Sequence, residues 1–418
     1  MTRVLPLAEL RFADQVREGD VVGWPQGPGE PLALTEALVA QGASLPRPTL
    51  LFGLSASATP RPELAAHFAL RVLNGAGNNR RITSLADIVP SSVSALPSLF
   101  ESGAIEIDVV LIHARKLADG RATLGVLADF TREMIGAARV VIAADNPKLP
   151  ALEGDAIVEA GDVDVWVEGD GRIVDMPDPE PSPVERAVAE QVASLIPDRA
   201  TVQLGVGTLP YAVAAALAGH RELGVHSGVV SDVLVDLAER GVVTNAHKGR
   251  DPGRTVTGGL FGTGRLRDFA ERSGTVDLRS AEYTHAIGVM ASLARFHTIN
   301  SAVEIDLTGQ VNSEVAGGRY LGAVGGQLDF VRGGVASPGG RSIIALPSAT
   351  PDGRLSRIVA SLSGPVTTPR SDVDVIVTEH GAAHLRGCSL AERARRLAAI
   401  AHPAHREALL HDMRKAVP

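Results

Sequence analysis

The stretch FHTINSAVEIDLTGQVNSEVAGGRYLGAVGGQLDFVRGG spans residues 296–334 and decides how this chain folds. Apolar and polar residues alternate along it, a pattern typical of strands. The alternation breaks at the pair Gly325-Gly326, after which a second strand-like run is expected at 327–331. Glycine pairs permit positive φ angles and let bare backbone N–H groups approach an anionic ligand. An isolated pair is more often a β-bulge or a tight turn, so the other motifs of the chain decide its meaning.

A second glycine loop, Gly205-Val206-Gly207, follows the apolar run TVQLGV at 201–206 and precedes the helix-like YAVAAALAG. Such a loop can aim helix N–H groups at a phosphate or carboxylate. A simple strand–helix turn explains it equally well. The loop lacks the third glycine of a dinucleotide fingerprint and carries Pro210, so a nicotinamide cofactor is not expected.

Proline alternates with other residues over 176–183, which predicts a stiff linker between two parts of the chain. Strand-like and helix-like segments alternate on both sides of it, as in parallel sheets covered by helices. The first half has strand-like runs at 122–130 and 138–146, and the second opens with a helix predicted over 184–196. The sequence thus predicts an α/β fold with an N-terminal domain over 1–182 and a C-terminal domain over 183–418.

Composition restricts the kind of protein. A net charge of −8 argues against nucleic acid or an anionic membrane as the main partner. The lone Cys388 excludes an internal disulfide and suits a reducing cytoplasm, where we expect the protein. The N-terminus has no apolar signal region, and no uncharged run reaches the roughly 18 residues of a membrane helix.

Several polar residues invite a functional interpretation. His380 and His384 are four apart and could share a helix face, a spacing that suits metal ligation, but no third ligand is evident and no metal is expected. His402, His405 and His411 are typical of a solvated C-terminal helix. Glu304 and Glu314 flank a strand predicted over 306–312; either could be a nucleophile, although Glu304 suits a structural role better.

Four ordered segments give the chain a family resemblance. They are GAVGGQLDF at 322–330, VQLGVGTLP at 202–210, and longer matches over 241–263 and 378–394. Together they resemble the class I CoA-transferase superfamily, in its acetyl-CoA hydrolase/transferase branch. The resemblance implies two related α/β domains with largely parallel sheets and the active site between them. It also implies acyl-CoA as the small-molecule partner and coenzyme A as substrate or product, with no resident cofactor. A homo-oligomer is expected.

The chain departs from this family at the position that matters most. In the family, the third residue of a His-Ser-Glu tripeptide attacks the acyl-CoA carbonyl and becomes a glutamyl-CoA thioester. Here the tripeptide is His226-Ser227-Gly228. Glycine has no side chain, so this covalent step cannot occur there, and the lost side chain would leave space for a water or a bulkier substrate. A carbonyl-orienting asparagine of the family falls on His285. Two further branch motifs are altered at 94–97 and 114–116.

Other site residues match the family. Gly326 matches the glycine whose N–H helps to form the oxyanion hole, Glu379 matches an active-site glutamate, and Glu30 matches a branch glutamate before proline. We expect Glu379 to act as acid/base, because a carboxylate in a water-poor pocket can have a raised pKa, with His285 assisting. The residues expected to contact substrate or CoA are Gly205, Gly207, Gly228, Gly325, Gln327 and Glu30.

The resulting hypothesis is an enzyme that acts on an acyl-CoA thioester without a covalent glutamyl-CoA intermediate, most simply by hydrolysis. Three alternatives stay open. The chain could be a CoA-transferase that uses another nucleophile or a ternary complex. It could carry out ring-opening or carbon–carbon chemistry on a CoA-linked substrate. It could also be a non-catalytic CoA-binding protein.

Overall fold

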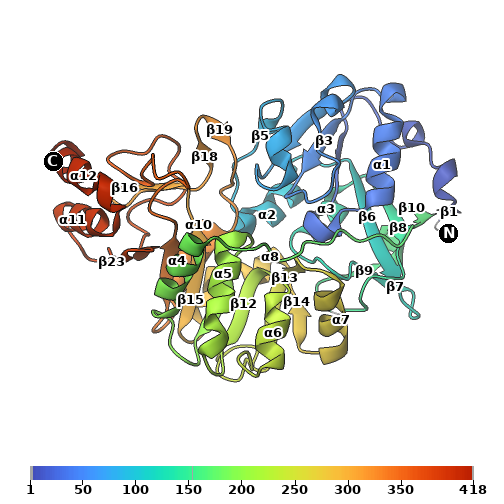
Figure 1. The fold of residues 1–418 in the computed structure, drawn as a ribbon. Helices are drawn as coiled ribbons and strands as arrows, with labels where there is room; N and C mark the ends of the chain where they lie inside the picture. Colours follow the sequence, from blue (N-terminus) through green and yellow to red (C-terminus); the bar gives the residue numbers. More distant parts are fainter. Residues whose placement is uncertain (1–2, 153, 417–418) are drawn as a thin grey trace. The chain divides into compact units, whose positions relative to one another are not determined.

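The computed structural model describes residues 3–152 and 154–416 and divides into two compact units (Figure 1). Unit 1 comprises Met1–Pro177 and Val256–Thr284, and unit 2 comprises Asp178–Thr255 and His285–Pro418. The first crossing between the units falls within the proline-rich segment 176–183. Two later crossings bracket residues 256–284, which return to unit 1.

Unit 1 is built on a parallel sheet with the strand order β1-β10-β8-β6-β2-β3-β4-β5. Its long central strand is β6, whose first six residues are buried, as expected for a strand covered on both faces. The strands are β1 (Arg3–Leu5), β2 (Val21–Gly23), β3 (Thr49–Phe52), β4 (Ala69–Val72), β5 (Asp87–Ile88), β6 (Val109–Lys116), β8 (Val140–Asp145) and β10 (Val165–Glu168).

Short antiparallel strands and helices complete unit 1. The strands β7 (Arg121–Thr123) and β9 (Ile157–Glu159) extend the sheet beside β6. The helices are α1 (Leu32–Ala40), α2 (Leu96–Glu101), α3 (Thr131–Ala137), α7 (Gly264–Ser273) and α8 (Ala281–Thr284). The returning segment also carries most of β13 (Thr255–Leu260) and all of β14 (Val276–Leu278).

The sheet strands of unit 2 follow the order β12-β11-β15-β20-β22-β23, and the pairs from β12 to β22 are parallel, whereas the edge strand β23 is antiparallel to β22. Helices α4 and α5 pack on each other and on this sheet, and α10 packs on β15 and β20 (Figure 1). The strands are β11 (Thr201–Leu204), β12 (Gly224–Val230), β15 (Phe296–Ser301), β20 (Arg341–Ala345), β22 (Val375–Thr378) and β23 (Gly381–His384). The helices are α4 (Pro183–Ala193), α5 (Thr208–Ala216), α6 (Val233–Glu239), α9 (Ile287–Ala291), α10 (Gln327–Ala336), α11 (Leu390–Ile400) and α12 (Pro403–Ala416).

Helix α4 begins where its sequence provides a cap. The Ser182 hydroxyl accepts a hydrogen bond from the Glu185 N–H at 3.2 Å, and the Glu185 carboxylate accepts from the Ser182 N–H at 2.8 Å. This reciprocal pair satisfies two N–H groups that a helix start leaves without partners. Val188, Ala189, Val192 and Ala193 then form the buried stripe of the helix, in agreement with the predicted helix over 184–196.

The predicted fold class is confirmed: the protein is α/β with largely parallel sheets. Individual elements differ from the prediction in four places. The run predicted as a strand at 327–331 is the start of helix α10, because Gln327, Phe330, Val331 and Gly334 recur at helical spacing and are buried. The strand predicted over 306–312 is two strands, β16 (Glu304–Asp306) and β17 (Val311–Asn312), joined by a turn.

The third difference concerns the histidine pair. His380 and His384 do not share a helix face, because residues 381–384 form the edge strand β23.

The fourth difference concerns the run predicted as a strand over 122–130. Only its first residues form a strand, as part of β7 (Arg121–Thr123). Beyond it the backbone turns at Gly125, where φ is +66°. A positive φ interrupts a strand and favours glycine.

Candidate active site

The site begins with strand β12, which carries the His226-Ser227-Gly228 tripeptide. The Ser227 hydroxyl donates a hydrogen bond of 2.7 Å to the Leu204 carbonyl at the end of the neighbouring strand β11. This bond fixes the tripeptide beside the loop that holds Gly205 and Gly207. Gly228 is the next residue along β12 and is half-buried.

The space above Gly228 is filled by a histidine. A methyl group added at Gly228 would lie 3.0 Å from Cε1 and 3.1 Å from Nε2 of His285. Both distances are shorter than ordinary van der Waals contact. The imidazole ring of His285 therefore limits the room directly beside Gly228, and the expectation that the lost side chain leaves space for a water or a bulkier substrate stays a prediction.

The same ring lies against the glycine pair. Gly325 has a φ of +55°, a left-handed value that favours glycine, and Gly326 is the N-cap of α10. A methyl group added at Gly326 would lie 2.6 Å from Nε2 of His285, which is a clash. The structure thus brings together Gly228, His285 and Gly326, three residues predicted from separate segments of the sequence.

His285 is held in an apolar environment. Its side chain is buried, and its ring lies 4.6 Å from the ring of Phe330, centroid to centroid, at an angle of 52°. Burial, together with the neighbouring His226, lowers the pKa of His285 to about 3. The imidazole is therefore neutral at physiological pH, which disfavours a role in storing a proton.

Gln327, the first residue of α10, is also buried, and its side-chain amide donates a hydrogen bond of 3.1 Å to the Thr368 hydroxyl. The Thr368 N–H in turn donates to the Val311 carbonyl at 3.1 Å. Gln327 therefore anchors the start of α10 to the strand region around Val311, which holds the adjacent glycine pair in place.

Glu379 lies on a cavity of about 900 Å³ within unit 2. It directly follows β22, and it accepts hydrogen bonds from the Ser348 hydroxyl and from the Ser348 N–H, the latter at 2.9 Å. His380 Nε2 lies 3.5 Å from the Glu379 carboxylate. The contacts recorded for Glu379 thus involve Ser348 and His380, not the His285 group.

Other residues that line this cavity were not predicted. They include Pro347, Arg357 and His402. The ring of His402 lies 6.0 Å from the ring of His380, centroid to centroid. Burial lowers the pKa of Arg357, while Glu185 and Glu379 oppose that shift. A sequence signal for Ser348 exists, since it follows the buried strand β20, and ligands of parallel sheets bind outside the carboxyl ends of strands.

The two predicted loop residues, Gly205 and Gly207, have different surroundings. Gly207, with a φ of +114°, is the N-cap of α5 and lines the same cavity as Glu379. Its φ is one that side chains rarely adopt. Gly205 packs against Pro210 within the loop. The start of α5 therefore presents backbone N–H groups where an anionic part of a ligand could bind.

Glu30 belongs to unit 1 and is fully enclosed. Its carboxylate accepts hydrogen bonds from the hydroxyls of Ser55 and Ser57, at 2.7 and 2.6 Å, and from the N–H groups of Ala56 and Ser57, at 2.7 and 3.0 Å. Burial raises its pKa, and these bonds act in the opposite direction. The four contacts indicate that Glu30 shapes the 55–57 turn; contact with a ligand stays a prediction.

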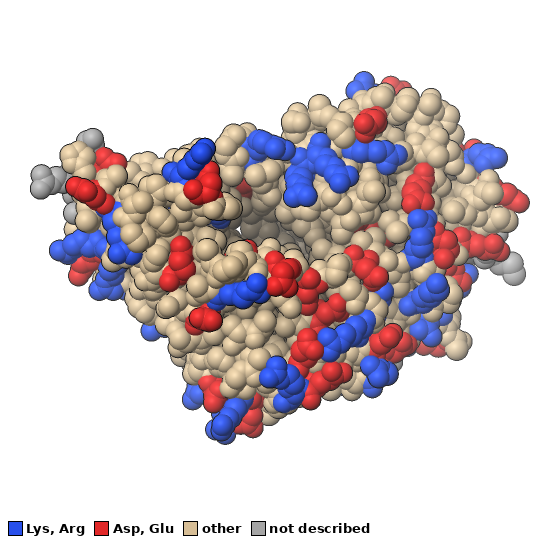
Figure 2. All heavy atoms as spheres, viewed as in Figure 1, with Lys and Arg blue, Asp and Glu red and all other residues tan. Residues whose placement is uncertain are grey.

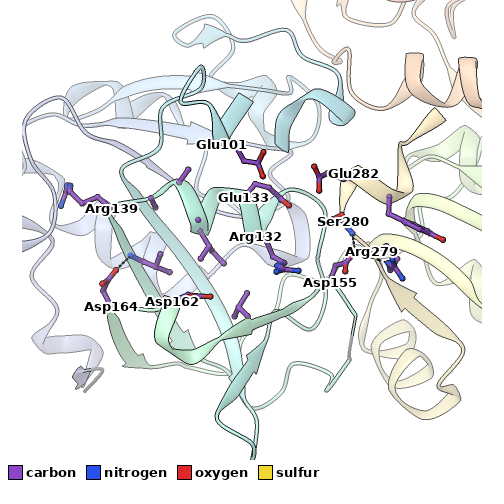
Figure 3. A pocket seen from close by; sticks show the side chains of 17 residues that line it. Glu101, Arg132, Glu133, Arg139, Asp155, Asp162, Asp164, Arg279, Ser280 and Glu282 are labelled. Carbon is purple, nitrogen blue, oxygen red and sulfur yellow. Dashed lines mark hydrogen bonds and ion pairs between the residues drawn. The ribbon is translucent and has the colours of Figure 1, made fainter. Parts of the chain in front are cut away.

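A second cavity, of about 1050 Å³, lies within unit 1 and contains none of the predicted site residues (Figure 3). Glu101, Glu133 and Glu282 lie near one another along one side of it, on α2, α3 and α8. Among the described residues, one carboxylate oxygen of Glu133 is buried without a hydrogen-bond partner. Burial, with Glu282 and Asp129, raises the pKa of Glu133 to about 7.

Two further observations concern ligands of other kinds. Within the described ranges, no helix is both long and apolar enough to cross a membrane, and no three His, Cys, Asp or Glu side chains are grouped so that they could hold a metal ion. Figure 2 shows acidic and basic side chains interspersed over most of the face in view.

Comparisons with known proteins complete the description. Residues 8–176 match the model of the acetyl-CoA hydrolase/transferase N-terminal domain, and residues 262–413 match that of the C-terminal domain. The chain is 40% identical over 333 residues to 4-hydroxybutyrate coenzyme A transferase of Clostridium kluyveri, which covers 79% of this chain and 78% of the relative.

Two solved structures are similar over nearly the whole chain. The crystal structure of RipA from Yersinia pestis superposes with a TM-score of 0.91 at 32% identity, covering 99% of this chain and 97% of the other. The crystal structure of 4-hydroxybutyrate CoA-transferase from Porphyromonas gingivalis superposes with a TM-score of 0.84 at 30% identity and the same coverage. Both likenesses extend through unit 1 and unit 2.

Proposed function

Because the chain belongs to the acetyl-CoA hydrolase/transferase family, we propose that it hydrolyses an acyl-CoA thioester without forming a covalent glutamyl-CoA intermediate. The observation that carries the proposal is the contact between Gly228 and His285. No carboxylate extends from position 228, and the imidazole of His285 lies 3.0–3.1 Å from the position that a Cβ would take there. A water molecule is then the simplest nucleophile for the thioester carbonyl.

Glu379 is the residue we assign to activate that water. Its carboxylate is oriented by two hydrogen bonds from Ser348 and lies on a cavity of about 900 Å³. As the water oxygen bonds to the carbonyl carbon, Glu379 takes a proton from the water, which is general-base catalysis. The carbonyl electron pair moves onto oxygen, where the Gly326 N–H stabilises the negative charge. The carbon–sulfur bond then breaks, the departing thiolate takes the proton back from Glu379, and the products are a carboxylic acid and coenzyme A.

The start of α5 supports the binding half of the proposal. Gly207 and the first turn of α5 line the same cavity as Glu379, together with Arg357 and His402. Helix N-termini and guanidinium groups bind phosphate and carboxylate oxygens. Coenzyme A carries phosphates at one end, and an acyl group can carry a carboxylate at the other. This cavity therefore offers partners for an anionic part of an acyl-CoA.

Transfer of CoA to a carboxylic acid is the second candidate function. The name of the Clostridium kluyveri relative favours it. Without a carboxylate at position 228, the acceptor carboxylate would attack the thioester carbonyl directly while both substrates are bound, which releases the CoA thiolate and leaves a mixed anhydride. The thiolate then attacks the acceptor carbonyl of that anhydride, and the original carboxylate leaves. The first step of transfer and of hydrolysis uses the same bound acyl-CoA and differs in the nucleophile.

One experiment separates the candidates. Wild-type protein is incubated with acetyl-, butyryl-, succinyl- and 4-hydroxybutyryl-CoA in ¹⁸O-labelled water, with and without acetate, and the products are identified by mass spectrometry. Hydrolysis yields free coenzyme A and a carboxylic acid that carries one ¹⁸O atom, whether or not acetate is present. With butyryl-, succinyl- or 4-hydroxybutyryl-CoA as substrate, transfer yields acetyl-CoA only when acetate is present. Binding by calorimetry without any product would identify a non-catalytic CoA-binding protein.

The absence of a covalent intermediate needs its own readout. Intact-protein mass spectrometry is carried out during turnover and after borohydride treatment, which traps acyl thioesters of carboxylates. We expect the mass of the unmodified chain. An adduct of CoA mapping to any glutamate would overturn this part of the proposal.

A further inference from the structure

The guanidinium group of Arg357 lines the cavity of Glu379 without a counter-ion of its own. The residue is half-buried, and within the described part of the chain its side chain forms no ion pair and no hydrogen bond. A guanidinium carries five N–H donors and stays charged in proteins. A charge that is partly removed from water costs free energy unless a partner compensates it. Such a group in a cavity therefore points to a ligand that brings the opposite charge.

The two carboxylates that line the same cavity are held by other donors. Glu185 accepts hydrogen bonds from the N–H and the hydroxyl of Ser182, at 2.8 and 2.7 Å, in the capping box of α4. Glu379 accepts from the N–H and the hydroxyl of Ser348. Both carboxylates are near enough to act electrostatically on Arg357, but neither is among its ion-pair partners in the described ranges. The guanidinium donors are therefore available to a third carboxylate.

Ser348 connects Arg357 to the proposed base. The Arg357 N–H donates to the Ser348 carbonyl at 2.9 Å, and the Ser348 N–H donates to the Glu379 carboxylate at 2.9 Å. The Arg357 carbonyl accepts from the N–H of Ile305 in β16 at 2.8 Å, which fixes this position of the chain from the other side. A ligand with a carboxylate on Arg357 and its reacting carbonyl at Glu379 therefore needs only a short spacer between the two groups.

Apolar side chains in the same cavity suit such a spacer. Leu209, Leu346 and Pro347 belong to the lining, and both leucines are buried. They offer surface to methylene groups, whereas Arg357 and Glu379 supply polar groups. Mostly apolar walls with a few placed polar groups are typical of small-molecule sites, and a volume of about 900 Å³ is within their usual range.

We propose that this cavity selects acyl-CoA substrates whose acyl group ends in a second carboxylate, the monothioesters of short dicarboxylic acids, and that Arg357 binds that carboxylate. The inference rests on the proposed function, because it names the substrate class of the same site. A guanidinium binds a carboxylate through two parallel N–H···O bonds, which also orient the acyl chain. An acyl group without the carboxylate leaves the guanidinium without a partner and is disfavoured for that reason.

Succinyl-CoA and butyryl-CoA form the matched pair of substrates, because their acyl chains are equally long and differ in the terminal carboxylate. kcat/KM is measured for both, after subtraction of the spontaneous hydrolysis of succinyl-CoA. We expect wild type to prefer succinyl-CoA by about 10- to 100-fold, the effect of one hydrogen-bonded charge pair. Arg357→Gln should bring this ratio close to one. Arg357→Lys keeps the charge but loses the planar fork, and its ratio should lie between the two.

Arg354→Gln is the matched control. The Arg354 side chain is 84% exposed and pairs with Asp352 at 3.6 Å, and it is not part of the cavity lining. Its ratio should equal that of wild type, and circular dichroism checks the fold of each variant. The CoA thioester of succinic acid monomethyl ester tests the same point without a variant, because it removes the charge of the carboxylate. Wild type should treat this compound like butyryl-CoA.

The outcomes separate this inference from the function it rests on. Turnover by wild type with a ratio near one, or an unchanged ratio in Arg357→Gln, would overturn the carboxylate site and leave the proposed function intact. An equal loss for both substrates would assign Arg357 to the coenzyme A phosphates that they share, and would also overturn it.

If wild type turns over neither thioester, the proposed function is wrong, and calorimetry then tests the site alone. Tighter binding of succinyl-CoA than of butyryl-CoA by wild type, lost in Arg357→Gln, would support the carboxylate site. Equal affinities of wild type for the two thioesters would overturn it.

Discussion

At the scale of single residues, the proposed function concerns two side chains in different surroundings. Glu379 is a carboxylate with hydrogen-bond donors on Ser348 and a cavity in front of it. His285 is an imidazole enclosed by glycine and phenylalanine. The first environment suits a group that accepts a proton, and the second suits a group that never carries a charge.

Glu379→Gln should lower the rate of acyl-CoA hydrolysis by roughly 10²–10⁴, the usual cost of losing a general base. The amide keeps the size of the side chain, so acyl-CoA affinity by calorimetry should change little. Ser348→Ala should lower the rate by less, because the carboxylate remains but loses its orienting bonds. Glu190→Gln on the exposed side of α4 serves as control. Normal turnover by Glu379→Gln would place the base elsewhere.

Gly228→Glu alone should form no glutamyl-CoA adduct, because its Cβ meets the His285 ring at 3.0 Å. The double variant Gly228→Glu with His285→Ala removes that ring, and we expect it to form an adduct detectable by intact-protein mass spectrometry. His285→Ala alone is the control, since it has the space but no carboxylate at 228. An adduct on the single Gly228→Glu variant would show that the His285 ring moves aside for the new side chain.

At the scale of elements, helices α4 and α11 each start with a capping box of the same composition. Ser182 pairs with Glu185, and Ser389 pairs with Glu392. Only α4 lies at the cavity of Glu379, which Ser182 and Glu185 help to line. Removing either cap should therefore destabilise its helix to a similar extent, but only the cap of α4 lies at the cavity of Glu379.

Ser182→Ala and Ser389→Ala should each destabilise their helix by about 1 kcal/mol, the typical cost of losing an N-cap side chain. Native-state hydrogen exchange should show faster exchange of amides in the first turns of α4 or α11, respectively. Only Ser182→Ala should also change KM for acyl-CoA. Equal effects of both variants on KM would argue against a site at the start of α4.

Much of the element pattern can be predicted from the sequence, because buried parallel strands are short apolar runs and helices repeat at 3.6 residues. This holds for β8, β11 and α4. The start of α10 was mispredicted because QLDFV alternates as a strand does, and only packing against β15, β20 and α9 shows it to be helical. The local sequence pattern does not show which elements a segment packs against in the folded protein.

The same limit applies to the site. Gly326, Gly228 and Glu379 stand in motifs and were predicted with their neighbours. His402 was missed because it lines a cavity of unit 2 that joins segments far apart in the chain. Ser348 was missed because its hydrogen bonds to Glu379 connect the ends of two different strands, β20 and β22. The contact of His285 with Gly228 joins positions 57 residues apart (285 minus 228), and no spacing rule connects such positions.

At the scale of the whole molecule, buried carboxyl groups in unit 1 make folding depend on pH. Burial raises the pKa of Glu133 to about 7 and that of Asp129 to about 6. A raised pKa means that the folded state binds protons more tightly than the unfolded state. The stability from each group is therefore complete below its ordinary pKa, near 4, and is lost as pH rises through the folded value.

Glu133→Gln should remove the larger of these penalties. Its melting temperature should match wild type near pH 4.5 and exceed it increasingly up to pH 8, corresponding to about 1–2 kcal/mol, a value reduced for the partial exposure of the side chain. Differential scanning calorimetry across this range measures the difference. Glu101→Gln, exposed on the same cavity, is the control. A difference in melting temperature between the variant and wild type that stays the same at all pH values would mean that Glu133 is not the titrating group.

The return of residues 256–284 to unit 1 has a consequence for how the protein is made. The N–H of Ala128 donates to the carbonyl of Gly258, and the N–H of Leu260 donates to the carbonyl of Val126, both at 2.8 Å. On the ribosome, these partners emerge more than a hundred residues after Val126. The nascent first half therefore lacks these two hydrogen-bond partners until residues 258 and 260 have emerged, when residues 178–255 of unit 2 have already been synthesised. The two units thus mature together during translation rather than one after the other.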